Sequence, residues 1–301
     1  MDVDLLVRTP PRECRNLRRS IGLAQSGFHS SSRSGAFVRR GAPAPLPVAM
    51  ASTFDAHAPA EGFRLTGADK LAFVTDMFDR VAPTYDLLNW FISLGQTTLW
   101  RLAALSWLHR WLPRRAEVLD VGCGTGWVSW FFRIRYRALD LRVTGMDCSP
   151  VMLREARRVV PDGTFYEGDV CHLPHPDDSF DAVVTVYTLR NFPNLAKGLE
   201  EMYRVTKPSG AVVILDAFPP QDAVTKGLVW FWLEWVAPVF ARIVSADPKA
   251  YKYLSASIRA TLPPGDVANV LRDLGAERVE VTRYTFGAAA RIVAVKPEGS
   301  E

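Results

Sequence analysis

The residues of this sequence that most clearly fit ligand binding form one glycine-rich loop. Residues 118–126 read VLDVGCGTG, an apolar strand that leads into a loop with glycine at every second position and then into a helix. Glycine lets the backbone turn tightly, and its missing Cβ lets a ligand approach the main chain. The sequence therefore predicts a binding site after this strand, formed by Asp120, Gly122, Gly124, Thr125 and Gly126.

Two carboxylates follow the next apolar runs at places that suit a nucleoside. Asp147 ends the run 143–147, where the second strand of a doubly wound sheet supplies the acid that accepts both ribose hydroxyls. Asp169 follows a third short apolar run, and a carboxylate there can accept a hydrogen bond from the amino group of an adenine. Because ligands of such sheets bind outside the carboxyl ends of the strands, we expect both acids to face the glycine loop.

Alternating strands and helices are expected to position these residues. Apolar residues recur at helical spacing over 73–81 and 99–108, which predicts N-terminal helices. After Pro113, short apolar runs alternate with helical stretches, so we predict an α/β fold with a mostly parallel sheet and helices on both faces. A turn at Gly287 predicts a closing antiparallel hairpin. The expected strands are 118–121, 143–146, 165–166, 182–187, 211–218, 279–284 and 291–295.

The loop and the two acids resemble the donor site of class I S-adenosylmethionine-dependent methyltransferases, whose glycine loop holds the methionine part of the donor. A more specific resemblance, over roughly residues 70–296, is to the ubiquinone/menaquinone C-methyltransferase family. It rests on MFDRVAPTYDLLN (77–89) with SLGQ (93–96) and WR (100–101), LRN (189–191), MYRVTKP (202–208) and YKYLSASI (251–258). The resemblance implies S-adenosylmethionine as methyl donor, a Rossmann-like seven-stranded methyltransferase domain over 70–297, and donor contacts from Val170 and Val186.

The family resemblance also implies a substrate class, a prenylated quinol methylated on a ring carbon. The segments 93–96, 100–101 and 106–107 look most like plastid and cyanobacterial members that make phylloquinone, which favours demethylphylloquinol or demethylmenaquinol as acceptor. One alternative is the 2-methoxy-6-polyprenyl-1,4-benzoquinol of mitochondrial ubiquinone synthesis. An alternative of another class is a catalytically idle scaffold of a quinone-synthesis complex.

Three residues are the candidates for the chemistry on the acceptor. A deprotonated quinol hydroxyl makes the ring carbon more nucleophilic, so a cation or a hydrogen-bonding group beside that hydroxyl would help. We expect Arg190 to stabilise the quinolate, and Tyr85 and Asn191 to orient the ring. The competing interpretations are structural: Arg190 as an ion-pair partner of Asp86, and Tyr85 as a cap over the cleft.

The sequence departs from the family at Trp127, where an acidic residue often follows the glycine loop. If that acid helps to hold the donor's positive charge, Trp127 replaces it only in part, through an aromatic face that attracts a cation. A rival class is a nicotinamide dehydrogenase, because Tyr203 and Lys207 have the Tyr-x-x-x-Lys spacing. We reject it because Pro208 and Gly210 follow at once, so the pair marks the end of a helix.

The charge is unevenly distributed, which bears on partners and location. Residues 1–50 carry eight Arg, no Lys and three acids, a balance of +5, so the total of +4 leaves −1 for residues 51–301. That leader predicts a disordered organelle transit peptide, followed by a linker over 51–69. We expect a plastid location, with the mitochondrion as the alternative, and no nucleic-acid partner, because the basic excess lies outside the predicted fold. Neither the four Cys nor the five His show a metal-site spacing, so we expect no metal.

The most apolar stretch, residues 228–244, includes Glu234, Pro238 and Arg242 and is too short to span a membrane. It is interpreted as a core or lid helix. Its tryptophans Trp230, Trp232 and Trp235 also suit an apolar substrate tail, a membrane surface or a dimer contact. Peripheral membrane association and a homodimer or quinone-synthesis complex are therefore the expected assemblies.

Overall fold

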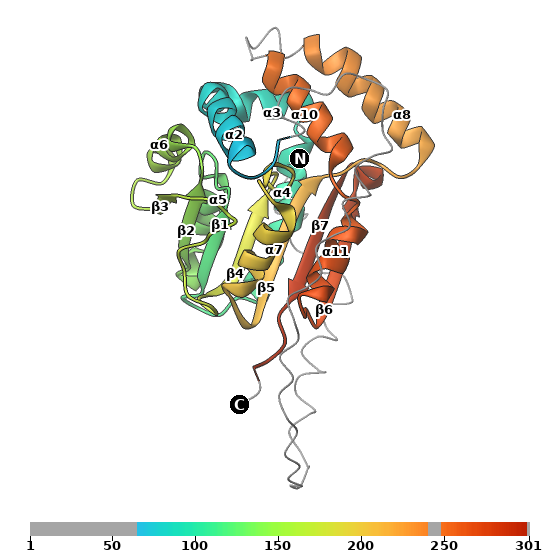
Figure 1. Ribbon diagram of the computed structural model, residues 1–301. Helices are drawn as coiled ribbons and strands as arrows, with labels where there is room; N and C mark the ends of the chain where they lie inside the picture. The colour runs from blue at the N-terminus through green and yellow to red at the C-terminus, as the bar shows by residue number, and fades with distance from the viewer. Residues whose placement is uncertain (1–64, 240–247, 300–301) are drawn as a thin grey trace, which may run out of the picture. The chain divides into compact units, whose positions relative to one another are not determined.

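The computed structural model describes residues 65–239 and 248–299 (Figure 1). The predicted transit peptide 1–50, most of the predicted linker 51–69 and residues 240–244 of the apolar stretch lie outside the described residues.

The centre of the fold is one seven-stranded sheet in the order β3-β2-β1-β4-β5-β7-β6. The first five strands are parallel neighbours, and β7 pairs antiparallel with both β5 and β6. The predicted mostly parallel sheet with an antiparallel closing hairpin is confirmed. The strands are β1 (Glu117–Val121), β2 (Arg142–Asp147), β3 (Thr164–Glu167), β4 (Phe180–Val186), β5 (Thr206–Ala217), β6 (Arg278–Tyr284) and β7 (Ala289–Val295).

Helices cover both faces of this sheet, because its central strands are apolar on both sides. On β4, Val183 belongs to a core shared with α7 and α11, and Val184 to a second core shared with α4 and α5. The α-helices are α2 (Gly67–Val81), α3 (Tyr85–Ser93), α4 (Gln96–Leu105), α5 (Trp127–Arg135), α6 (Pro150–Val159), α7 (Leu195–Arg204), α8 (Ala223–Phe231), α10 (Pro248–Ala260) and α11 (Pro264–Asp273). Short 3₁₀ segments are η2 (Ala82–Thr84), η3 (Leu108–Arg110), η4 (Arg137–Leu139), η5 (Leu189–Asn191) and η7 (Thr285–Gly287), and η6 (Trp232–Val236) is a π-helix.

Local signals in the sequence explain where several helices begin. Ser149, Asn194 and Asp222 are the N-caps of α6, α7 and α8, and each side chain accepts a hydrogen bond from a backbone N–H three residues later. Tyr203 lies in the last turn of α7, whereas Lys207 lies on β5 with its Nζ 2.9 Å from Asp181. The two residues of the Tyr-x-x-x-Lys spacing thus belong to different elements.

Helices α2, α3, α8 and α10 lie beyond the edge at which the parallel strands end (Figure 1). Leu88 and Ile92 of α3 pack against Leu233 of η6 and Ile258 of α10. The indole Nε1 of Trp232 donates a hydrogen bond of 2.7 Å to the carbonyl of Ile92. These contacts join the N-terminal helices to the segment after β5, so both border the ligand-binding edge of the sheet.

The apolar stretch from residue 228 forms the end of α8 and then η6. α8 has no buried residue and Trp235 of η6 is 70% exposed, whereas Leu233 and Ala237 are buried against α3 and α10. The stretch is thus buried on one side only, which fits a lid helix better than a core helix. Among the described residues, no helix is long and apolar enough to cross a membrane.

Candidate active site

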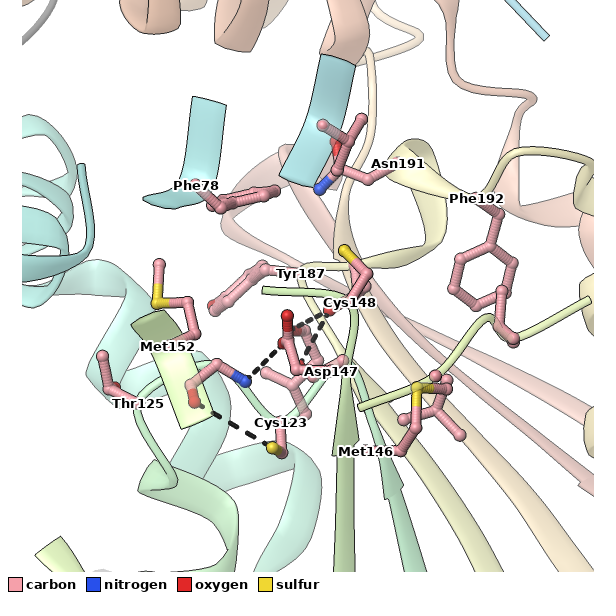
Figure 2. A pocket seen from close by; sticks show the side chains of 18 of the residues that line it. Phe78, Cys123, Thr125, Met146, Asp147, Cys148, Met152, Tyr187, Asn191 and Phe192 are labelled. Carbon is pink, nitrogen blue, oxygen red and sulfur yellow. Dashed lines mark hydrogen bonds between the residues drawn. The ribbon is translucent and has the colours of Figure 1, made fainter. Parts of the chain in front are cut away.

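A cavity opens at the carboxyl ends of β1, β2 and β4 and holds about 830 Å³ of space between atoms, part of it open to solvent. Figure 2 shows Phe78 and Asn191 bordering it on one side and Asp147 on the other. It brings together nine of the residues predicted from the sequence: Tyr85, Gly122, Gly124, Thr125, Asp147, Asp169, Val170, Val186 and Asn191. Asp120, Gly126 and Arg190 lie behind this lining.

The three loop glycines have different physical roles, although all have positive φ. At Gly122 a Cβ would lie 2.2 Å from the side chain of Thr188, and at Gly126 it would lie 3.0 Å from Ala156. Both positions need glycine for close packing. At Gly124 a Cβ would meet no atom within 4 Å, because that position faces the cavity. Space for a ligand against the main chain is thus left at Gly124.

Asp147 ties the end of β2 to the glycine loop. Its Oδ2 accepts a hydrogen bond of 2.8 Å from the backbone N–H of Gly124, and its Oδ1 accepts one of 2.9 Å from Ser149. Burial raises the pKa of Asp147, and these backbone hydrogen bonds limit the rise. Each carboxylate oxygen keeps a further lone pair, so the predicted contact with ribose hydroxyls is compatible with this geometry.

Asp169 stands further along the sheet, after β3. Its Oδ1 accepts a hydrogen bond of 2.9 Å from the N–H of Cys171, and its Oδ2 lies 3.2 Å from Nδ1 of His172. The neighbouring Val170 is buried and also lines the cavity. An acid and an apolar side chain at this end suit the edge and the face of a purine base.

Asp120 is a buried carboxylate near the hydroxyl of Ser129 and the charge of Arg101. It is 1% exposed, and neither oxygen has a hydrogen-bond partner among the described residues. Burial and the nearby charge of Asp147 raise the pKa of Asp120 to about 8, while Arg101 opposes the shift. A carboxylate in this state favours a ligand that carries positive charge, because such a ligand would stabilise its ionised form.

Arg101 is a residue of the site that the sequence analysis did not select. It comes from α4, lines the cavity, and places its guanidinium 5.0 Å from the ring centre of Trp127 and 5.3 Å from that of Tyr187. A cation thus does lie over Trp127, but it belongs to the protein. In the sequence, Arg101 was noted only as part of the segment WR. That segment does not indicate which aromatic rings Arg101 contacts.

The acceptor side of the cavity is apolar, with one polar group that has no partner. Phe78 and Phe192 contribute rings, and Tyr85 lies with its ring edge-on to Phe78 at 5.7 Å. Both amide atoms of Asn191 are buried without a hydrogen-bond partner among the described residues. A buried amide left unpaired costs about 1–3 kcal/mol, so this group is available to a ligand with a hydroxyl or carbonyl.

Arg190 forms a buried ion pair with Asp216, and the backbone N–H of Arg190 donates to the same carboxylate at 3.3 Å. The alternative prediction, an ion pair between Arg190 and Asp86, is therefore wrong. Asp86 instead accepts a hydrogen bond of 2.7 Å from Thr125 Oγ1. Although burial opposes the charge, Asp216 and Tyr85 raise the pKa of Arg190 above its usual value. Arg190 is therefore a permanent cation directly behind the cavity.

Solved methyltransferases share this fold. A protein of Thermotoga maritima, described as a possible histamine N-methyltransferase, aligns with a TM-score of 0.51 and 20% identity, covering 73% of this chain and 99% of that one. The putative methyltransferase in a Haloferax volcanii complex with the activator Trm112 aligns with a TM-score of 0.53 and 19% identity. That alignment covers 76% of this chain and 99% of the other. The fold is that of the class I S-adenosylmethionine-dependent methyltransferases.

The sequence comparisons narrow this class to one family. The family model described as "ubiE/COQ5 methyltransferase family" matches residues 66–296. Demethylmenaquinone methyltransferases of Deinococcus radiodurans and Roseiflexus sp. are 38% and 33% identical over 232 and 229 residues. These alignments cover 76% and 75% of this chain and 94% of each relative. The chain belongs to the ubiE/COQ5 methyltransferase family, as its sequence predicted, and its methyl donor is S-adenosylmethionine.

The residues present fit that donor. The open space at Gly124 accommodates a ligand against the loop, and Asp120 supplies an unpartnered buried carboxylate beneath it for a donor that carries a sulfonium and an ammonium group. Asp147 ends β2 and Asp169 follows β3, the next strand of the sheet. A donor lying across these strand ends would place its ribose at Asp147 and its adenine at Asp169. When bound, the donor supplies an electrophilic methyl group on a positively charged sulfur.

Proposed function

We propose that this protein methylates a ring carbon of a prenylated naphthoquinol, a demethylphylloquinol or demethylmenaquinol. The observation that carries the proposal is the unpartnered amide of Asn191 in an otherwise apolar, aromatic part of the cavity. A prenylated quinol offers a hydroxyl for that amide, and a flat ring and an apolar tail for its surroundings. The names of the relatives, which act on demethylmenaquinone, support a naphthalene ring over a benzene ring.

On the donor side, we assign Gly124 and Thr125 to the amino-acid part, Asp147 to the ribose and Asp169 to the adenine. Val170, which follows β3, and Val186, at the end of β4, pack against the ligand. Asp120 lies at the end of β1, just before the loop, and the positive charge of a bound donor would favour ionisation of this buried carboxyl. Asp147 has a second function, because its hydrogen bond to Gly124 fixes the loop before any ligand binds.

On the acceptor side, Asn191 and Tyr85 orient the quinol and Arg190 stabilises its ionised form. Burial raises the pKa of Tyr85, so its hydroxyl is protonated at neutral pH and acts as a hydrogen-bond donor. Arg190 counteracts that rise at Tyr85, a residue of the cavity lining, so its charge acts there. At Tyr253 the charge of Arg190 also lowers the pKa, and that of Asp216 acts against it. The same charge would lower the pKa of a quinol hydroxyl, ordinarily about 10, and make the ring carbon more nucleophilic.

The test is methyl transfer by the full-length protein from labelled S-adenosylmethionine to two chemically reduced acceptors. One is a prenylated demethylnaphthoquinol and the other a 2-methoxy-6-polyprenyl-1,4-benzoquinol. We expect transfer to the naphthoquinol only. Preference for the benzoquinol would assign the protein to ubiquinone synthesis, and donor binding without transfer to either quinol would favour an idle scaffold. The oxidised quinones serve as controls, because they lack the electron-rich ring.

We further propose that the protein takes this substrate from a membrane surface. Val224, Leu228 and Phe231 on α8 and Trp235 on η6 recur at helical spacing, and all are more than half exposed. Such a stripe suits the interface of a bilayer. We expect the protein to float with phosphatidylcholine vesicles, and Phe231→Ser with Trp235→Ser to abolish flotation. Phe286→Ser is the matched control, since Phe286 is 83% exposed but lies in η7 between β6 and β7.

A plastid location is proposed on the basis of residues 1–50. Their eight Arg and few acids suit import into an organelle. A fluorescent protein fused behind residues 1–50 should enter plastids in leaf protoplasts, and a fusion with the eight Arg changed to Gln should stay outside. Entry into mitochondria would assign the protein to that organelle instead.

A further inference from the structure

Arg101 is the only cation among the described residues that line the cavity. The residue is 8% exposed, and the rings of Trp127 and Tyr187 both lie within 5.3 Å of its guanidinium carbon. When a guanidinium stacks on an aromatic ring, its flat face is against the ring. The N–H donors at its edge then remain free for hydrogen bonds.

The donors of Arg101 lack a hydrogen-bonded anion. Its Nε has no partner among the described residues, and its closest acid is Asp86, with NH1 and Oδ1 3.9 Å apart. Asp86 is half exposed, and its other oxygen, Oδ2, accepts a hydrogen bond from the hydroxyl of Thr125. Asp120, the other acid that acts on Arg101, accepts no hydrogen bond from it, since neither oxygen of Asp120 has a partner among the described residues. Arg101 is thus a buried cation whose ion pair with Asp86 is long and half exposed, so a ligand that hydrogen-bonds to it with a negative charge would stabilise it further.

We propose that Arg101 binds the α-carboxylate of the donor's amino-acid part. The inference rests on the proposed donor site, in which adenine and ribose lie at β3 and β2. The order β3-β2-β1-β4 then brings the amino-acid part to the ends of β1 and β4. Trp127 begins the helix after β1 and Tyr187 directly follows β4, so Arg101 lies between the two strands that this part reaches. The planar fork of a guanidinium matches a carboxylate with two parallel hydrogen bonds.

Trp127 has a defined function in this arrangement. An acid at position 127 would neutralise Arg101, whereas an aromatic ring holds the guanidinium in place and leaves its donors to the ligand.

The test measures binding alone, by titration calorimetry of the full-length protein with two ligands. One is S-adenosylhomocysteine, and the other is its decarboxylated analogue, which lacks only the carboxylate. We expect the wild-type protein to bind the first about 10- to 100-fold more tightly, the range for charge-assisted hydrogen bonds. Arg101→Met should remove that preference and leave the affinity for the analogue unchanged. Arg101→Lys, which keeps the charge but not the fork, should lie between.

Arg291→Met is the matched control. Arg291 also lies over a tryptophan, 5.0 Å from Trp107, and its Nε is also unpartnered among the described residues, but it is not part of the cavity lining. This variant should keep the full preference for S-adenosylhomocysteine.

Each failure has its own signature. Equal affinity of the wild-type protein for both ligands overturns the inference, and that measurement does not depend on any variant folding. The inference also fails if Arg101→Met weakens both ligands alike, or weakens neither and only slows transfer to the quinol. If the wild-type protein binds neither ligand, the donor site of the proposed function is what fails.

Discussion

The guanidinium of Arg190 and the carboxylate of Asp216 form an ion pair in which both side chains are almost completely buried. The pair connects η5, which also carries Asn191, to the end of β5. Arg190 therefore helps to hold η5 in place, in addition to the function that we propose for its charge.

Separating these two functions requires removal of both charges. Arg190→Met should lower the free energy of unfolding by about 3–5 kcal/mol, because it leaves Asp216 buried and uncompensated. Adding Asp216→Asn should recover most of that loss, since the amide oxygen can still accept the N–H of Ala217. Turnover should not recover, because the cation behind Tyr85 is still missing. Urea unfolding and methyl transfer provide the two readouts, and wild-type turnover in the double variant would reduce Arg190 to a structural role.

Gly124→Ala should separate donor binding from stability. The new Cβ meets no atom of the protein, so the cost is the strain of a positive φ, about 1 kcal/mol. The methyl group would nevertheless occupy space next to the cavity, and we expect at least tenfold weaker binding of S-adenosylhomocysteine. Gly67→Ala is the control, because Gly67 has a similar φ and equally open surroundings but begins α2 outside the lining. It should show the same loss of stability with unchanged binding.

Asp120 should make stability fall as pH rises. Its pKa is about 8 in the folded protein and about 4 when unfolded, so between these values only the folded state holds the proton. Each pH unit in that window removes up to about 1.4 kcal/mol of stability. Asp120→Asn lacks this loss, and relative to wild type it should gain roughly 2–4 kcal/mol between pH 5 and pH 8 in urea unfolding. A constant difference across this range would mean that Asp120 is already ionised in the folded protein.

Two asparagines provide a contrast between a ligand-binding amide and a structural one. Asn191→Leu removes an amide without partners, so stability should stay the same or rise by about 1 kcal/mol, while turnover falls at least tenfold. Asn194→Ala removes the N-cap of α7, whose Oδ1 accepts the N–H of Lys197 at 3.1 Å. That variant should lose about 1 kcal/mol of stability and keep its turnover. Unchanged kinetics in Asn191→Leu would remove the amide from quinol binding.

The order of strands and helices and the positions of the glycine loop, Asp147 and Asp169 could be predicted from the sequence. These features depend on local signals, namely the spacing of apolar residues, glycines at a turn and acids directly after strands. Parallel strands end at one edge, so locally defined residues such as Gly124 and Asp147 meet there without further information. The resemblance of separate segments then identified the family.

Only the tertiary structure decided which side chains lack partners and which have them. Asp216 replaced Asp86 as the partner of Arg190, and Arg101 came to lie between Trp127 and Tyr187, which are far from it in the chain. Such pairings depend on distances through space and on exclusion of water, and neither leaves a periodic trace in the sequence. For the same physical reason, the unpaired groups of Asp120, Asn191 and Arg101, to which we assign ligand contacts, became visible only after the surrounding helices had packed.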